Sequence, residues 1–108
     1  MNATQAVRAL SALAHEARLA VFKLLVEAGP AGLPAGVIAE KLLIAPSALT
    51  FHLKELTNVN LLVQRPEGRK IYYGAHFDSM NAVVAYLTDN CCGGAACAID
   101  PALAVPCC

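Results

Sequence analysis

The spacing of apolar residues changes once along this chain, close to Leu61, and this change limits the folds that the chain can adopt. Before Leu61, apolar residues recur every three or four positions, as they do on one face of an α-helix. After Leu61 the spacing falls to two, which predicts strands at Leu62–Arg65 and Arg69–Tyr73. Pro66, Glu67 and Gly68 lie between these strands and are typical of a hairpin turn. The sequence therefore predicts a helical body followed by a β-hairpin.

Four helices are predicted before the hairpin and one after it. Their expected bounds are residues 4–14, Glu16–Ala28, Ala35–Leu43, Pro46 to about Val59, and Asp78–Thr88. Gly29 and Pro30 end the second helix, and Pro34 opens the third, where its missing N–H costs nothing. Only Ile44 and Ala45 separate the third helix from the fourth, so these two helices form a helix-turn-helix pair. The predicted fold is mostly α with a β-hairpin wing: a winged helix-turn-helix in the order α-α-α-α-β-β-α.

The length of 108 residues suits one domain, which we place at residues 1–89, followed by a cysteine-rich tail at residues 90–108. No run of 18 apolar residues occurs, so no membrane-spanning segment and no membrane partner are expected. The first residues lack the basic and apolar stretches of a signal peptide. We therefore expect a cytoplasmic protein whose thiols stay reduced.

The predicted fourth helix has an apolar face and a polar face. Leu49, Leu53 and Leu56 form a stripe that is expected to be buried. In a helix-turn-helix the second helix enters the major groove, where hydroxyl groups and cations reach base edges or phosphates and an aromatic ring packs on a thymine methyl. The candidates for such contacts are Ser47, Thr50, Phe51, His52 and Lys54. For His52, a role as a surface or helix-packing residue is a second interpretation.

Charge is unevenly distributed along the chain, although the formal net charge is zero. Between Lys41 and Lys70, five basic residues stand against two acidic ones, whereas residues 75–108 contain three aspartates and no Lys or Arg. Three of the basic residues surround the predicted hairpin: Arg65, Arg69 and Lys70. A wing that lies along phosphates needs a basic surface of this kind. The sequence therefore predicts double-stranded operator DNA as a partner.

Three segments resemble a known family: Leu13–Leu19 (LAHEARL), Ser47–Leu56 (SALTFHLKEL) and Gly68–Tyr73 (GRKIYY). Over residues 5–88 the chain resembles the ArsR/SmtB family of dimeric winged-helix repressors, which metal or metalloid ions release from DNA. The resemblance implies that Ser47, Thr50 and Phe51 occupy base- or phosphate-contacting positions. It also implies a homodimer formed through the first and last helices.

Apolar stripes on these two helices suit such an interface. The first helix carries Val7, Leu10 and Leu13 at helical spacing, and the last helix carries Val83, Val84 and Leu87. Each stripe would leave an apolar surface exposed on a monomer. We therefore expect both stripes to be accessible in a single chain.

The metal-binding positions of the family are not present in this sequence. Many arsenic-responsive members carry a Cys-x-Cys pair on the helix before the recognition helix, but residues 36–42 contain no thiol here. Zinc-responsive members use acidic and His ligands along the last helix, and His76, Asp78 and Asp89 do not have a convincing spacing. Sensing is therefore expected to involve another part of the chain.

The five cysteines all lie in the last 18 residues. Adjacent residues such as Cys91 and Cys92 are about 3.8 Å apart at Cα, closer than ordinary disulfide geometry allows, but both thiolates can bind one large soft ion. Gly93 and Gly94 let the backbone fold back, so that Cys97 becomes a third ligand. Three thiolates suit a soft trigonal centre such as As(III) or Sb(III). We therefore predict As(III) as the inducer, bound by Cys91, Cys92 and Cys97, with no organic cofactor.

Other interpretations of the tail stay open. Cys107 or Cys108 would complete a four-thiolate zinc site, and Cd(II) or Pb(II) accept three or four thiolates. A disulfide between more distant cysteines would make a redox switch, or the thiols have no role at all. A cysteine-rich metal-buffering protein that does not bind DNA belongs to a different class, and the chain has no Cys-x-x-Cys motif to support it. Taken together, the sequence predicts a homodimeric transcriptional repressor that is not an enzyme.

Overall fold

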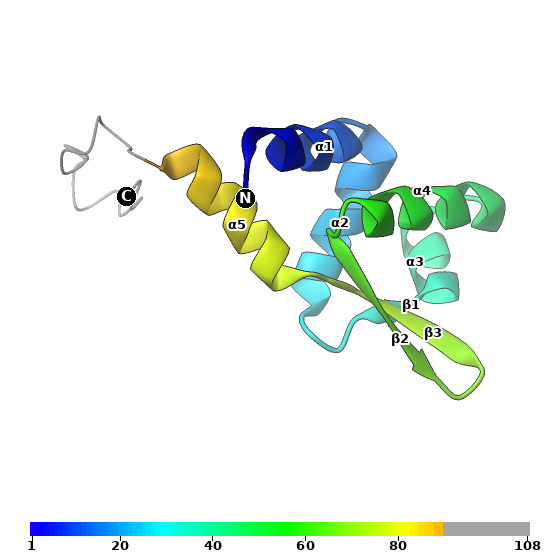
Figure 1. Ribbon diagram of the computed structural model, residues 1–108. Coiled ribbons are helices and arrows are strands. Elements are labelled where there is room, and N and C mark those ends of the chain that lie inside the picture. Colours follow the sequence, from blue (N-terminus) through cyan, green and yellow to red (C-terminus); the bar gives the residue numbers. More distant parts are fainter. Residues whose placement is uncertain (90–108) are drawn as a thin grey trace, which may run out of the picture.

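Five helices and three short strands follow one another in the computed structural model, which describes residues 1–89 (Figure 1). The elements are α1 (Ala3–Leu13), α2 (Glu16–Ala28), β1 (Leu33–Pro34), α3 (Ala35–Leu42), α4 (Pro46–Asn58), β2 (Leu62–Glu67), β3 (Lys70–Ala75) and α5 (Phe77–Thr88). A helix-turn-helix pair is thus followed by a hairpin and a final helix. The winged helix-turn-helix predicted from the sequence is confirmed, and no helix end differs from its prediction by more than one residue.

Polar side chains define where three of the helices begin. The Asn2 side chain accepts a hydrogen bond from the Gln5 backbone N–H (2.8 Å), and the Gln5 side chain accepts one from the Asn2 N–H (3.0 Å), which is a capping box. His15 Nδ1 accepts from the Ala17 N–H at the start of α2, and His76 Nδ1 accepts from the Ser79 N–H at the start of α5. Each cap satisfies an N–H that the first helical turn leaves unpaired.

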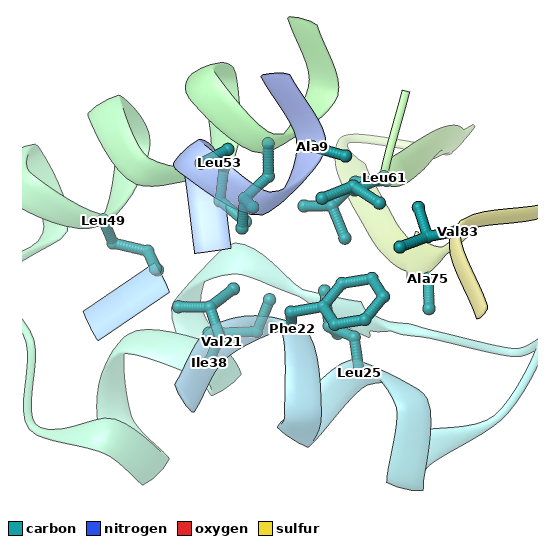
Figure 2. Close-up of a cluster of buried hydrophobic side chains, with 13 residues drawn as sticks. Ala9, Val21, Phe22, Leu25, Ile38, Leu49, Leu53, Leu61, Ala75 and Val83 are labelled. Atoms are coloured by element: carbon teal, nitrogen blue, oxygen red, sulfur yellow. The ribbon is translucent and has the colours of Figure 1, made fainter. Parts of the chain in front are cut away.

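The hydrophobic core is built around α2, which packs against α1, α3, α4 and β3. Figure 2 shows Phe22 and Leu25 of α2 among side chains from several of these elements. The predicted stripe of Leu49, Leu53 and Leu56 on α4 is buried, each residue being at most 2% exposed. Within residues 1–89 no polar or charged side chain is buried. The core is therefore apolar throughout, and burial of this apolar surface stabilises the domain.

The sheet has three strands, one more than predicted, because the short strand β1 pairs with the hairpin. The strand order is β1-β3-β2, and all pairs are antiparallel. Leu33 of β1 lies opposite Tyr73 of β3. Gly32, just before β1, has a φ of 69°, and a Cβ at this position would collide with the Tyr73 carbonyl oxygen. A glycine at residue 32 is therefore what lets the α2–β1 loop approach β3.

The hairpin is longer than predicted, and its turn lies further along the chain. The prediction of a turn at Pro66, Glu67 and Gly68 is wrong, because β2 continues to Glu67 and the turn consists of Gly68 and Arg69. Gly68 has a φ of 64°, which a two-residue turn with glycine in its first position requires. Pro66 is accommodated opposite Ile71 because β2 is an edge strand, where a missing N–H is tolerated.

The apolar stripes of α1 and α5 are only partly exposed. Val7 and Leu10 are 61% and 39% exposed, and Val84 and Leu87 are 54% and 60% exposed. Val83 is only 7% exposed, so its expected place in an accessible stripe is wrong. The reason is that α1 turns its small residues Ala6, Ala9 and Ala12 to the core and thereby brings α5 close enough to bury Val83.

Candidate nucleic-acid interface

The polar face of α4 is open to solvent over its first half. Ser47, Thr50, Phe51 and Lys54 are all exposed, as predicted, while Leu49 and Leu53 anchor the opposite face. The Thr50 hydroxyl donates a hydrogen bond to the Pro46 carbonyl oxygen (2.9 Å). Its oxygen lone pairs therefore remain available as acceptors, while its proton is already used. Phe51 is 54% exposed and contributes the only large aromatic surface of this face.

A left-handed residue makes the turn between α3 and α4. Leu43 ends α3 with a φ of 55°, a conformation that is uncommon for a residue with a Cβ. The Ile44 N–H then donates to the Ala39 carbonyl oxygen, which closes the end of α3 (3.1 Å). The two helices meet at 114°. This arrangement lets α4 project from the domain, as the second helix of a helix-turn-helix must do to enter the major groove.

His52 differs from the other four candidates on α4 because it contacts α2. Its Nδ1 accepts a hydrogen bond from Arg18 Nε at 3.3 Å, and its ring lies 4.9 Å from the His15 ring. Burial lowers the pKa of His52 from its ordinary value, and the nearby His15 and Arg18 lower it further. The side chain is half-buried, which fits the helix-packing interpretation of this residue better than a DNA contact.

The three basic residues of the wing have different surroundings. Arg65 donates through Nη2 to the Ala31 carbonyl oxygen and pairs with Glu67, both at 3.1 Å, and its guanidinium lies 5.2 Å from the centre of the Tyr72 ring. Arg69 and Lys70 are exposed at the hairpin tip and form no ion pair within residues 1–89. In Figure 1 this tip points away from α5, on the side of the molecule that carries α3 and α4. All three are exposed, and Arg69 and Lys70 are the two that are not engaged in an ion pair within the described residues.

The predicted metal ligands Cys91, Cys92 and Cys97 lie outside the described residues. In residues 1–89 no group of three His, Cys, Asp or Glu side chains is arranged to hold a metal ion. His76, considered above for a zinc site, is used as the cap of α5. The same part of the chain contains no single helix that is long and apolar enough to cross a membrane. Taken together, α3 and α4 have the length and composition of a span, but they are bent by 114°.

Comparisons with known proteins agree with this architecture. A family model described as a helix-turn-helix domain matches residues 13–65, from the end of α1 into β2. The fold is similar to an ArsR-like transcriptional regulator from Rhodococcus sp. RHA1, with a TM-score of 0.69 and 26% identity over 78% of this chain and 76% of that one. NolR from Sinorhizobium fredii has a TM-score of 0.65 and 32% identity over 81% of this chain and 84% of that one. This chain belongs to the ArsR family of winged-helix transcriptional regulators.

A curated relative of this ArsR-family protein is longer. The nodulation protein NolR of Rhizobium meliloti is 34% identical over 80 residues, which are 74% of this chain and 63% of NolR. The chain therefore spans less than two thirds of the length of that curated relative.

Sequence reasoning missed Arg18, which the structure places against the recognition helix of this ArsR-family protein. Its contacts with Phe51 and His52 join residues more than 30 positions apart in the chain. The only signal in the sequence was the position of Arg18 inside the LAHEARL segment that carries the family resemblance. Nothing in the local pattern of α2 distinguishes it from a solvated cation on a helix surface.

Proposed function

We propose that this protein is a homodimeric transcriptional repressor that binds operator DNA through α4 and the wing. The observation that carries the proposal is the exposed face of α4, with Ser47, Thr50, Phe51 and Lys54, together with the exposed cations of the hairpin tip, Arg69 and Lys70. Hydroxyl and aromatic groups at the front of the helix suit base edges, and cations at the tip suit phosphates. Arg65 is also exposed, but its guanidinium contacts Ala31, Glu67 and Tyr72, so we assign it to support of the wing.

A gel-shift titration with promoter DNA of the protein's own gene separates the two kinds of contact. Arg69→Ala and Lys70→Ala should each weaken binding to promoter and random DNA alike and lower the slope of log affinity against log salt by about 1, because phosphate contacts carry no sequence information. Ser47→Ala and Thr50→Ala should mainly weaken promoter binding, by roughly 0.5–1.5 kcal/mol each, as expected for one hydrogen bond. Lys23→Ala, which removes an exposed cation from α2, is the control and should change neither. Unaltered affinity and salt slope in both wing variants would show that the wing does not contact phosphates.

The proposed inducer is As(III), or the related Sb(III), bound by Cys91, Cys92 and Cys97. The support is chemical: three thiolates and no other strong donor within the segment Cys91–Cys97 suit a soft trigonal ion. The described residues also offer no alternative metal cluster, so the tail holds the strongest set of ligands in the sequence. The names of the NolR relatives mention no ligand, so the support for As(III) comes from the cysteines of this chain alone.

Cysteine variants test this assignment through DNA release. Cys91→Ser, Cys92→Ser and Cys97→Ser should each keep promoter affinity near that of the wild type and each abolish release by arsenite, because two thiolates hold a three-coordinate centre far less well than three. The control is the double change Cys107→Ser with Cys108→Ser, which should leave release largely intact. If one of the three cysteines can be replaced without loss of release, the bound species needs only two thiolates, as a methylated trivalent arsenical does.

Parallel titrations distinguish the remaining candidates. Release by cadmium or zinc, but not by arsenite, would replace the proposed inducer with another soft metal. Release by peroxide in the absence of metal, reversed by dithiothreitol, would show a redox switch instead. Binding of metal by a protein that retards no promoter DNA would favour a metal-buffering role and would contradict the repressor.

A further inference from the structure

A cluster formed by His15, Arg18, Phe51 and His52 joins α2 to the exposed face of α4. Arg18 Nε donates to His52 Nδ1 at 3.3 Å, and the Arg18 guanidinium carbon lies 5.4 Å from the centre of the Phe51 ring. One side chain of α2 thus contacts two consecutive residues of the recognition helix. The Phe51 and His52 rings are 6.0 Å apart in an edge-on arrangement, so the contacts belong to one group.

The positive charge of Arg18 is directed at this group rather than at a carboxylate. Within residues 1–89 the only ion pair joins Arg65 and Glu67, although Arg18 lines the same hollow as Glu55. A guanidinium near an aromatic ring is attracted to its electron-rich face, and the attraction grows as the cation loses water. Arg18 is partly buried, and its contacts with Phe51 and His52 are made in this partly desolvated position.

Phe51 is one of the side chains that the proposed function places against DNA. Its ring is 54% exposed, and an exposed aromatic side chain without a neighbour would populate several rotamers. Contact with Arg18 favours one of them. Because ordering a side chain on binding costs conformational entropy, a ring that is already held presents a defined surface to a base at lower cost.

We propose that Arg18 is a positioning residue that determines sequence specificity: it holds the Phe51 ring from α2 and so fixes the shape of the DNA-reading face of α4. The inference rests on the proposed DNA-binding function. Arg18 acts through Phe51 and not through a phosphate of its own. His52 completes the arrangement by accepting the Nε hydrogen bond, which orients the plane of the guanidinium.

The test measures the ratio of affinities for two DNA duplexes. One duplex is selected from a randomised library by the wild-type protein, and the other is a shuffled version of it. Arg18→Gln should lower this ratio about twofold to tenfold, the cost of ordering one side chain on binding, because the Phe51 ring is then no longer held before it meets a base. Lys23→Gln removes the same charge from the exposed side of α2 and should leave the ratio unchanged. Both variants should bind the shuffled duplex with similar affinity.

A double-mutant cycle then tests whether Arg18 acts through Phe51. In a Phe51→Leu background, Arg18→Gln should cost clearly less specificity than it does in the wild type, because the contact is already absent. Additive effects, or a salt slope reduced by about 1 in Arg18→Gln, would show that Arg18 binds a phosphate directly and would overturn the inference. Should Arg18→Gln fail to fold, as judged by circular dichroism, Arg18→Lys takes its place in the cycle with the same expected sign. A wild-type protein that selects no sequence would instead refute the proposed function.

Discussion

At the scale of single residues, the environment of His52 differs from those of both of its neighbours in the chain. It stands between Phe51 and Leu53, one facing solvent and the other the core, and lies half-buried against α2. To accept a hydrogen bond from Arg18, its Nδ1 must carry a lone pair, so the imidazole must be neutral. The lowered pKa of His52 is consistent with this requirement, since burial, His15 and Arg18 all disfavour its charged form.

The stability of the domain is therefore expected to depend on the protonation of His52. In the unfolded chain a histidine has a pKa of about 6.5, and in the folded protein the pKa of His52 lies lower. As the pH falls below about 6.5, the unfolded state takes up the proton first, so the contribution of His52 is present above that pH and is lost below it. Chemical denaturation of the wild type and of His52→Gln between pH 7.5 and pH 5 measures this difference. Parallel stability curves would show that His52 does not titrate as described.

Single-residue environments were predictable only where the helical period decides them. Leu49, Leu53 and Leu56 are buried as predicted, because burial on an amphipathic helix follows from spacing alone. The contact between Arg18 and His52 depends on how two helices cross, and the spacing within either helix carries no information about it. For the same reason Arg65 was grouped with Arg69 and Lys70, although its guanidinium is bound to Ala31 on a distant loop.

At the scale of elements, β1 shows what a sequence pattern cannot reveal. It consists of Leu33 and Pro34, too short for alternation and containing a residue that is poor in strands. It becomes a strand because the tertiary fold brings the loop after Gly32 against β3. The helices and the main hairpin are predictable from their periodicity and from the Gly and Pro residues between them. The position of the turn is not, because proline is common both in turns and in edge strands, and Pro66 lies in an edge strand.

The loop before β1 is expected to be intolerant of a side chain at residue 32. Gly32→Ala introduces a Cβ where φ is 69° and where the Tyr73 carbonyl already lies, so we expect a loss of roughly 2 kcal/mol or more of unfolding free energy. The matched control is Gly36→Ala in α3, where a Cβ meets nothing within 4 Å. That change should be neutral or stabilise the domain by up to about 1 kcal/mol, since alanine favours helix. Urea denaturation of the two variants measures both effects, and equal stability would contradict the proposed packing.

At the scale of the whole molecule, α1 and α5 each leave apolar side chains uncovered in the monomer. Val7 and Leu10 on α1, and Val84 and Leu87 on α5, are each at least 39% exposed. A domain of this size gains stability by burying such surface against a second copy. The proposed homodimer therefore uses the outer edge of each helix, while the inner edges, with Ala9 and Val83, belong to the core.

Charged substitutions in this surface should produce monomers. Leu10→Glu or Val84→Glu would place a carboxylate in the apolar interface. Promoter affinity should then fall sharply, because the two recognition helices are no longer held together in a dimer. Leu43→Glu is the control for assembly, since Leu43 is 92% exposed on the α3–α4 turn and belongs to neither helix. Sedimentation velocity measures the outcome. A dimer that persists in both Leu10→Glu and Val84→Glu would place the interface elsewhere.

The joint between β3 and α5 has a mechanical consequence. A single residue, His76, separates the strand from the helix, and it is bound on both sides: its N–H donates to the Leu61 carbonyl at 2.8 Å, and its ring caps α5. The strand and the helix are therefore joined without a flexible loop, so a rotation of α5 about a pivot at His76 would be passed on to the hairpin rather than absorbed between the two elements. With a rise of about 3.3 Å per residue in the strand, a tilt of about 5° at the pivot would displace the wing tip by roughly 1.5–2 Å. Since that tip carries Arg69 and Lys70, a small change in how two copies of α5 meet in the proposed homodimer would become a displacement large enough to break a hydrogen bond to a phosphate.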